Sequence, residues 1–225
     1  MKKFSGIVTI AASALSLILL VTLHFLEPQF DPNWHFVSEY ALGPWGWILS
    51  SVFLLVALGC WAIVPFAWSW LPRWGGRLGL AFIVLGGLAI AVAAFNSIDP
   101  ILDGPTKLTT HGNIHGLMSI IGNPALSLGM LITSLALARQ LPAGSRAMVR
   151  IIGFLPWVSL LAMFAIIGLT LPAAGIFGPQ VPLGWPNRLV FMVYELWLVV
   201  IALSLVKQNW QPIVAKKSKF TKQES

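Results

Sequence analysis

The chain has 225 residues, of which 57% are hydrophobic and only 9% are charged. Soluble domains carry about 25% charged residues, so this composition excludes an ordinary soluble protein and indicates a membrane protein. The net charge of +7 does not indicate a nucleic-acid partner, because basic loops on one side of a membrane explain it. The single cysteine, Cys60, lies in an apolar run and has no second cysteine with which to form an internal disulfide.

Six apolar stretches are long enough to cross a bilayer, since a transmembrane helix needs about 20 mainly apolar residues. They cover residues 6–26, 47–70, 78–95, 112–138, 151–171 and 189–206. The sequence therefore predicts an all-α fold, an integral membrane six-helix bundle over residues 1–206, followed by a basic cytoplasmic tail over 207–225. The first stretch resembles a signal peptide but lacks a small-residue cleavage site, so we expect it to be retained as a helix.

The basic residues predict the orientation of these helices. If the six stretches span in turn, 12 of the 14 lysines and arginines fall on one side, and only Lys107 and Arg188 fall on the other. By the positive-inside rule the basic side is cytoplasmic. We therefore expect a multi-pass protein of the cell membrane, surrounded by membrane lipids, with both termini in the cytoplasm.

Most of the acidic residues and all four histidines fall on the opposite, extracytoplasmic side. The first loop there contains Ser38-Glu39-x-x-x-Gly43, and the second contains Asp99-Pro100 and then Gly112-x-x-His115. This pattern resembles the domain of unknown function 998 family, which consists of small six-helix prokaryotic membrane proteins. The resemblance implies a fold and a membrane location but no established activity. The positions that match the pattern are Ser38, Glu39, Asp99, Gly112 and His115.

The same loops could form a metal-dependent catalytic site. If Thr110 caps the fourth helix, His111 and His115 lie on one helix face, at a spacing that lets two imidazoles bind a divalent metal such as zinc. Asp99 could be a third ligand, and Glu39 could be a general base acting on bound water. We expect Glu39, Asp99, His111 and His115 to converge in one polar pocket.

Structural roles are alternatives for each of these residues. A Glu39–His115 or Asp99–His115 pair could simply hold two loops together. Ser38 could be a nucleophile activated by a histidine, or it could cap the second helix or turn the loop. A pairing of His24 with His115 around a haem is a further alternative.

Two charged residues fall at or within the sixth stretch. Glu195 lies seven residues beyond Arg188, or about 10 Å along a helix, so the two cannot contact each other directly. A carboxyl group at that depth is costly unless it turns inward and finds a partner. We expect the partner to be His24, Asn96 or Asn113, with either a structural or a functional role.

Three functions are compatible with these observations. The first is a membrane bundle whose polar His/Asp/Glu pocket on the extracytoplasmic side binds a lipid or a partner protein. The second is an intramembrane metal-dependent hydrolase or transferase that acts on a lipid-like substrate. The third is a small transporter that uses Glu195, although six helices are few for a transporter.

Overall fold

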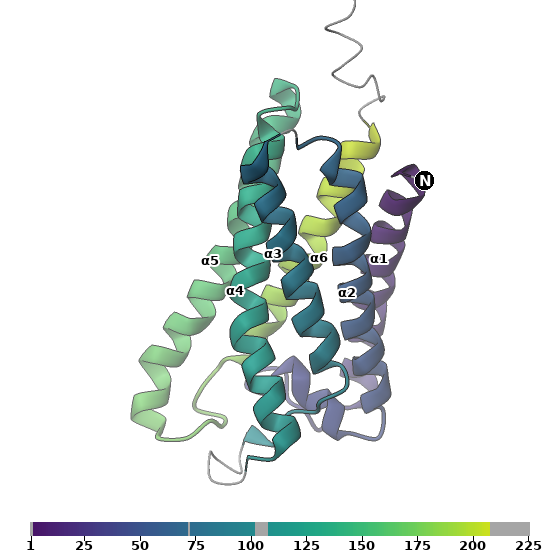
Figure 1. The fold of residues 1–225 in the computed structure, drawn as a ribbon. Helices are drawn as coiled ribbons and strands as arrows, with labels where there is room; N and C mark the ends of the chain where they lie inside the picture. The colour runs from purple at the N-terminus through teal and green to yellow at the C-terminus, as the bar shows by residue number, and fades with distance from the viewer. Residues whose placement is uncertain (1, 72, 102–107, 208–225) are drawn as a thin grey trace, which may run out of the picture.

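The structure is a computed structural model that describes residues 2–71, 73–101 and 108–207. Asp103, Lys107 and residues 208–225 of the predicted tail lie outside the described residues, whereas Lys207 is the last residue of α6. Six α-helices and one short 3₁₀-helix follow one another along the chain, and the described residues contain no strand (Figure 1). They are α1 (Lys2–Leu26), η1 (Val37–Leu42), α2 (Gly46–Trp68), α3 (Trp74–Ala93), α4 (Thr110–Ala138), α5 (Ala143–Ala174) and α6 (Gly184–Lys207).

The predicted all-α membrane bundle is confirmed. Each of the six α-helices is long and apolar enough to cross a membrane. The helices extend beyond the apolar stretches, most of all in α5, which begins at Ala143 and includes Arg146 and Arg150. The apolar run predicts where a helix is in contact with lipid, whereas arginine is a good helix former and allows the helix to continue past that point.

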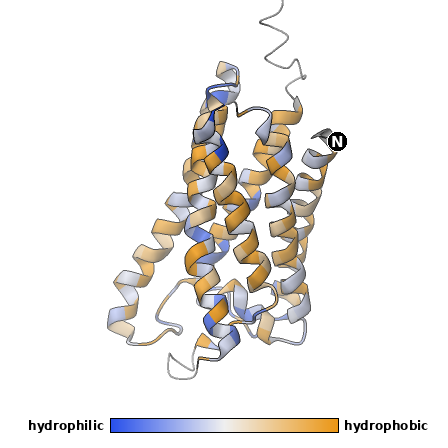
Figure 2. Cartoon of the chain, viewed as in Figure 1, coloured by the Kyte–Doolittle hydropathy of each residue, from blue (hydrophilic) through white to orange (hydrophobic). Residues whose placement is uncertain are grey.

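Neighbouring helices in sequence are neighbours in space, and α6 closes the ring by packing against α1. Figure 1 shows that α1 begins and α6 ends at the same end of the bundle, which we call the terminal end. The opposite end, where η1 and the longer connections lie, is called the loop end. Hydrophobic residues cover most of the length of the helices, and hydrophilic residues gather mainly toward the ends (Figure 2).

Helices α3 and α4 approach closely through glycines. A methyl group added to Gly79 would lie 2.5 Å from the Thr133 hydroxyl oxygen, and one added to Gly129 would lie 2.7 Å from the Gly79 carbonyl oxygen. Small residues at such interfaces let helix backbones pack without a hydrophobic driving force from water. The glycine-rich third stretch therefore serves tight helix packing.

Helix α6 is joined to its neighbours by buried hydrogen bonds. The Tyr194 hydroxyl lies 3.1 Å from that of Ser127 on α4 and donates to the Asn123 carbonyl oxygen at 3.1 Å. The Trp197 ring nitrogen donates to the Ser134 hydroxyl at 2.8 Å. Interhelical hydrogen bonds of this kind contribute about 0.6–2 kcal/mol each within a membrane. They fix the rotation of α6, and so place its polar residues inside the bundle.

Candidate functional site

A cavity of about 430 Å³ lies toward the loop end of the bundle. Its wall is mainly apolar and aromatic, and it comes from the loops and from α2 to α6. The polar side chains in the wall are those of Ser38, His115, Ser119, Asn123 and Asn187. A concave apolar space with a few polar groups is the usual form of a small-molecule site.

His115 is the only histidine in this wall, and its ring is held by backbone. Nδ1 lies 2.8 Å from the Asn96 carbonyl oxygen, the Ala93 carbonyl also lies near the ring, and the side chain is only 4% exposed. A carbonyl oxygen can only accept a hydrogen bond, so Nδ1 carries the hydrogen. In the neutral ring Nε2 then has a free lone pair and can accept a hydrogen bond or a proton.

Asp99 and Thr109 together form the start of α4. The Asp99 carboxylate accepts hydrogen bonds from the Thr109 amide and hydroxyl, both at 2.8 Å, and the Thr109 hydroxyl oxygen accepts from the Gly112 amide at 3.1 Å. The expectation that Thr110 caps this helix is therefore wrong by one residue, because Asp99 fixes Thr109 in the capping position. Asp99 also explains why residue 112 is a glycine, because an added methyl group there would lie 1.9 Å from an Asp99 carboxylate oxygen.

Glu39 forms a second group of contacts, which joins the two loops. It is 2% exposed and accepts from His35 Nδ1 at 2.8 Å, from the Phe36 amide at 3.0 Å and from the Ile101 amide at 3.4 Å. The side-chain partner of Glu39 is thus His35, a residue outside the family pattern. Its contact with Ile101 brings the first loop beside the second.

The four residues expected in one pocket have different neighbours. Glu39 contacts His35, Asp99 contacts Thr109, and His111 lies exposed with Nδ1 3.0 Å from the Asn96 side-chain oxygen. Of the four, only His115 lines the cavity. Asn96 is the common neighbour of both histidines, since its side chain contacts His111 and its backbone contacts His115.

A metal ion held by His111, His115 and Asp99 stays a prediction. Within residues 2–71, 73–101 and 108–207, no three His, Cys, Asp or Glu side chains form a group that could hold a metal ion. His24 is also engaged, because Nδ1 contacts the Leu20 carbonyl and Nε2 accepts from Arg188, both at 2.8 Å. It has no ring nitrogen left for a haem.

Arg188 is the centre of a polar network beside the cavity. Its guanidinium donates to His24 Nε2 at 2.8 Å, to the His35 and Gly184 carbonyl oxygens at 2.8 and 3.1 Å, and to the Tyr40 hydroxyl at 2.9 Å. The residue is only 1% exposed. Because these partners come from α1, from the loop with η1 and from α6, Arg188 holds the three together.

Glu195 points into the bundle, as the cost of a carboxyl group in lipid requires, and is 2% exposed. Its partner is the Ser16 hydroxyl on α1, which donates to the carboxyl group. The expected partners, His24, Asn96 and Asn113, were therefore wrong. Residues 179 positions apart meet here because α6 closes the helix ring against α1.

The sequence interpretation missed several polar residues that are buried or half-buried. Glu27 is 1% exposed and accepts from the Trp45 amide at 2.6 Å and from the Gln29 side chain. A methyl group added to Gly43 would lie 2.2 Å from its carboxylate oxygen, so the glycine of the first motif makes room for Glu27. Asn187 accepts from the Val37 amide at 2.9 Å. Tyr40 could have been noticed, because the chain has only two tyrosines but 13 phenylalanines.

Comparison with known proteins gives a family and no further relative. No curated protein and no solved structure matches the chain. A family model described as "Protein of unknown function (DUF998)" matches residues 10–204, which is most of the chain and runs from within α1 to within α6. The resemblance carried by the two loops is thereby confirmed, and the chain belongs to the DUF998 family.

Proposed function

We propose that this protein binds an amphipathic, lipid-like molecule in the cavity at the loop end, with His115 as its main polar contact. The observation that carries the proposal is the cavity itself, whose volume of about 430 Å³ and aromatic wall suit an apolar chain. Its lining residues Ile120 and Phe164 are 72% and 52% exposed, so the wall continues onto the surface that lipid contacts. A molecule in the bilayer could thus enter from the side.

The proposal includes an orientation in the cell membrane. The terminal end carries Arg73, Arg77, Arg139, Arg146 and Arg150, which lie in or beside its helix connections. Under the positive-inside rule this end is cytoplasmic and both termini are cytoplasmic. The cavity then opens within the outer leaflet, and its ligand is a lipid of that leaflet.

His115 suits the recognition of a hydroxyl or another hydrogen-bond donor in a lipid head group. With Nδ1 bound to the Asn96 carbonyl, the ring is fixed in one tautomer and offers an acceptor at Nε2. Ser38 and Asn187 add polar groups from η1 and α6 to the same wall. Apolar neighbours such as Met118 and Phe191 supply contacts for a chain.

A pair of matched glycine variants tests this proposal. Gly116 lines the cavity and Gly168 does not, and a Cβ atom added at either would meet nothing within 4 Å. The protein is placed in lipid nanodiscs with a phospholipid that carries a photoactivatable group in its acyl chain. Gly116→Phe should abolish crosslinks to residues of the cavity wall, whereas Gly168→Phe should keep them. Equal crosslinking in both variants would contradict the proposal.

A second candidate function is a hydrolase or transferase that acts on the bound lipid. It is favoured by one observation, the presence of Ser38 and His115 in the same cavity wall. The Ser38 hydroxyl has no hydrogen-bond partner among the described residues, so this role requires substrate binding to bring it within hydrogen-bond reach of His115 Nε2. Labelling with a lipophilic fluorophosphonate tests it, with Ser119→Ala as the control for Ser38→Ala. Labelling that survives Ser38→Ala would exclude this role.

A further inference from the structure

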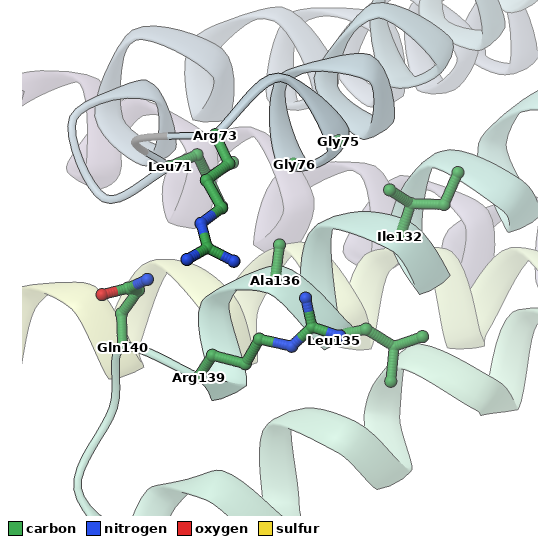
Figure 3. Close-up of a pocket in the computed structure, with 9 residues that line it drawn as sticks. All are labelled: Leu71, Arg73, Gly75, Gly76, Ile132, Leu135, Ala136, Arg139 and Gln140. Carbon is green, nitrogen blue, oxygen red and sulfur yellow. The ribbon is translucent and has the colours of Figure 1, made fainter.

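A second cavity lies at the terminal end, at the opposite end of the bundle from the cavity that contains His115. It has a volume of about 620 Å³ and lies between the start of α3 and the end of α4. Its wall consists of Leu71, Arg73, Gly75, Gly76, Ile132, Leu135, Ala136, Arg139 and Gln140. Figure 3 shows the Arg73 side chain extending from the α3 side toward Ala136 and Gln140 of the α4 side.

The two arginines in this wall have their charges free. Both are exposed, and among the described residues no hydrogen bond or ion pair joins the side chain of Arg73 or Arg139 to another residue. Two other arginines at this end, Arg77 and Arg146, have partners for their side chains. Arg77 donates to the Leu71 carbonyl oxygen at 3.1 Å and stacks 4.5 Å from the Trp68 ring, and Arg146 donates to the Leu141 carbonyl oxygen at 3.3 Å.

The backbone at the cavity favours an anion as well. Gly75 and Gly76 belong to the first turn of α3, which has no side-chain cap, so backbone amides there have no partner within the helix. A methyl group added to Gly75 would meet nothing within 4 Å, which shows open space above it. Free amides and two guanidinium groups are the ligands that bind phosphate oxygens.

The apolar part of the wall distinguishes a lipid from a soluble anion. Ile132 and Leu135 continue the cavity along α4 from the arginines toward the middle of the bundle. A phosphate in the arginine region would therefore have an apolar surface beneath it, on which an acyl chain can lie. This combination is the one expected at the boundary of head groups and chains.

We propose that the cavity of Arg73 and Arg139 binds the phosphate of an anionic phospholipid in the leaflet at the terminal end. Both guanidinium groups and the α3 amides contact the phosphate, and an acyl chain packs on Ile132 and Leu135. This site is separate from the cavity at the loop end, and neither depends on the other.

Binding of phosphatidylglycerol to the full chain tests this site, measured by native mass spectrometry of protein released from nanodiscs of phosphatidylcholine with a small fraction of phosphatidylglycerol. The double variant Arg73→Gln/Arg139→Gln should reduce binding of phosphatidylglycerol about 30-fold. This factor follows because each arginine near a membrane surface contributes roughly one kcal/mol to the attraction of an anionic lipid. The control, Arg146→Gln/Arg150→Gln, removes the same charge from the same end outside the cavity and should change binding less than about threefold.

Four further results decide the outcome. Gly75→Leu keeps both charges but fills the open space, and should also reduce phosphatidylglycerol binding. Equal losses in the two double variants would overturn the proposal, because the attraction would then be a general surface charge effect. Displacement of the lipid by millimolar inorganic phosphate would also overturn it, in favour of a soluble anion. Unchanged thermal unfolding of each variant shows that the fold is retained.

Discussion

The Nε atom of Arg188 donates a hydrogen bond to Nε2 of His24 at 2.8 Å, which joins α6 to α1 near the loop end. Since arginine can only donate, His24 Nε2 must carry the lone pair, and Nδ1 must carry the hydrogen that it shares with the Leu20 carbonyl. The bond therefore requires a neutral imidazole in one tautomer. It places a histidine, not a carboxylate, against a buried guanidinium.

His24→Phe should destabilise the protein by about 1–3 kcal/mol, because Arg188 Nε–H then has no acceptor in a buried site. His24→Gln should recover much of this loss, since a glutamine oxygen can take the place of Nε2. Unfolding in mixed micelles with increasing denaturing detergent measures both. If phenylalanine is tolerated as well as glutamine, the hydrogen bond with Arg188 contributes nothing to stability.

Gly112→Ala should also destabilise the protein, by about 1–3 kcal/mol, the usual cost of overpacking. The added methyl group would lie 1.9 Å from the Asp99 carboxylate and would displace it from Thr109. The matched control is Gly168→Ala, where an added methyl group meets nothing within 4 Å. This control should be neutral or slightly stabilising, because alanine favours a helix.

A double-mutant cycle tests whether Asp99 is the cause. In an Asp99→Ser background the clash is absent, so Gly112→Ala should cost clearly less than it does in the wild type. Strict additivity of the two substitutions would show that the glycine is required for another reason. The readout is the same detergent-unfolding measurement.

Glu195→Gln should be better tolerated than Glu195→Leu. The amide can still accept the Ser16 hydroxyl hydrogen bond inside the bundle, whereas leucine leaves that hydroxyl only the Ser13 carbonyl oxygen as an acceptor. We expect the free energies of unfolding of the two variants to differ by about 0.5–1.5 kcal/mol, the usual net contribution of one hydrogen bond, measured from the shift of the unfolding midpoint. Equal stability of leucine and wild type would show that the carboxyl group anchors nothing.

The proposed orientation predicts the result of reporter fusions. Fusions after Arg77 and Arg150 should report a cytoplasmic location, and fusions near Asp31 and Pro182 should report the outside. The physical reason is the resistance of basic loops to translocation. A cytoplasmic signal at Pro182 would reverse the orientation, and with it the leaflet assigned to each cavity.

The membrane bundle was predictable because hydrophobicity adds up over about 20 residues, so an error at one position does not remove a helix. The two loop motifs likewise indicated the family to which the chain belongs. The partner of Glu195 was not predictable, because Ser16 is 179 positions away and nothing local indicates the closure of the helix ring. Local sequence therefore predicted the burial of Glu195 but not its neighbour.

The candidate site shows the same division between local and long-range information. Thr109 and Thr110 are equally good caps in sequence, and the long-range contact with Asp99 selects Thr109. The family pattern pointed to His115, while its position in a cavity depends on residues from η1, α2, α3, α5, α6 and the loops. The sequence did not show why the loop motifs contain glycine. In the structure, Gly43 makes room for the Glu27 carboxylate and Gly112 for the Asp99 carboxylate.

The occupancy of the cavity at the loop end is tested most directly by His115→Asn. The asparagine amide can replace the Nδ1–H bond to the Asn96 carbonyl but has nothing in place of Nε2, so the fold should persist while the polar contact is lost. With the photoactivatable phospholipid, we predict at least a tenfold weaker crosslink to the segment 115–123 and unchanged thermal unfolding. Undiminished crosslinking to this segment in a stable His115→Asn protein would contradict the account.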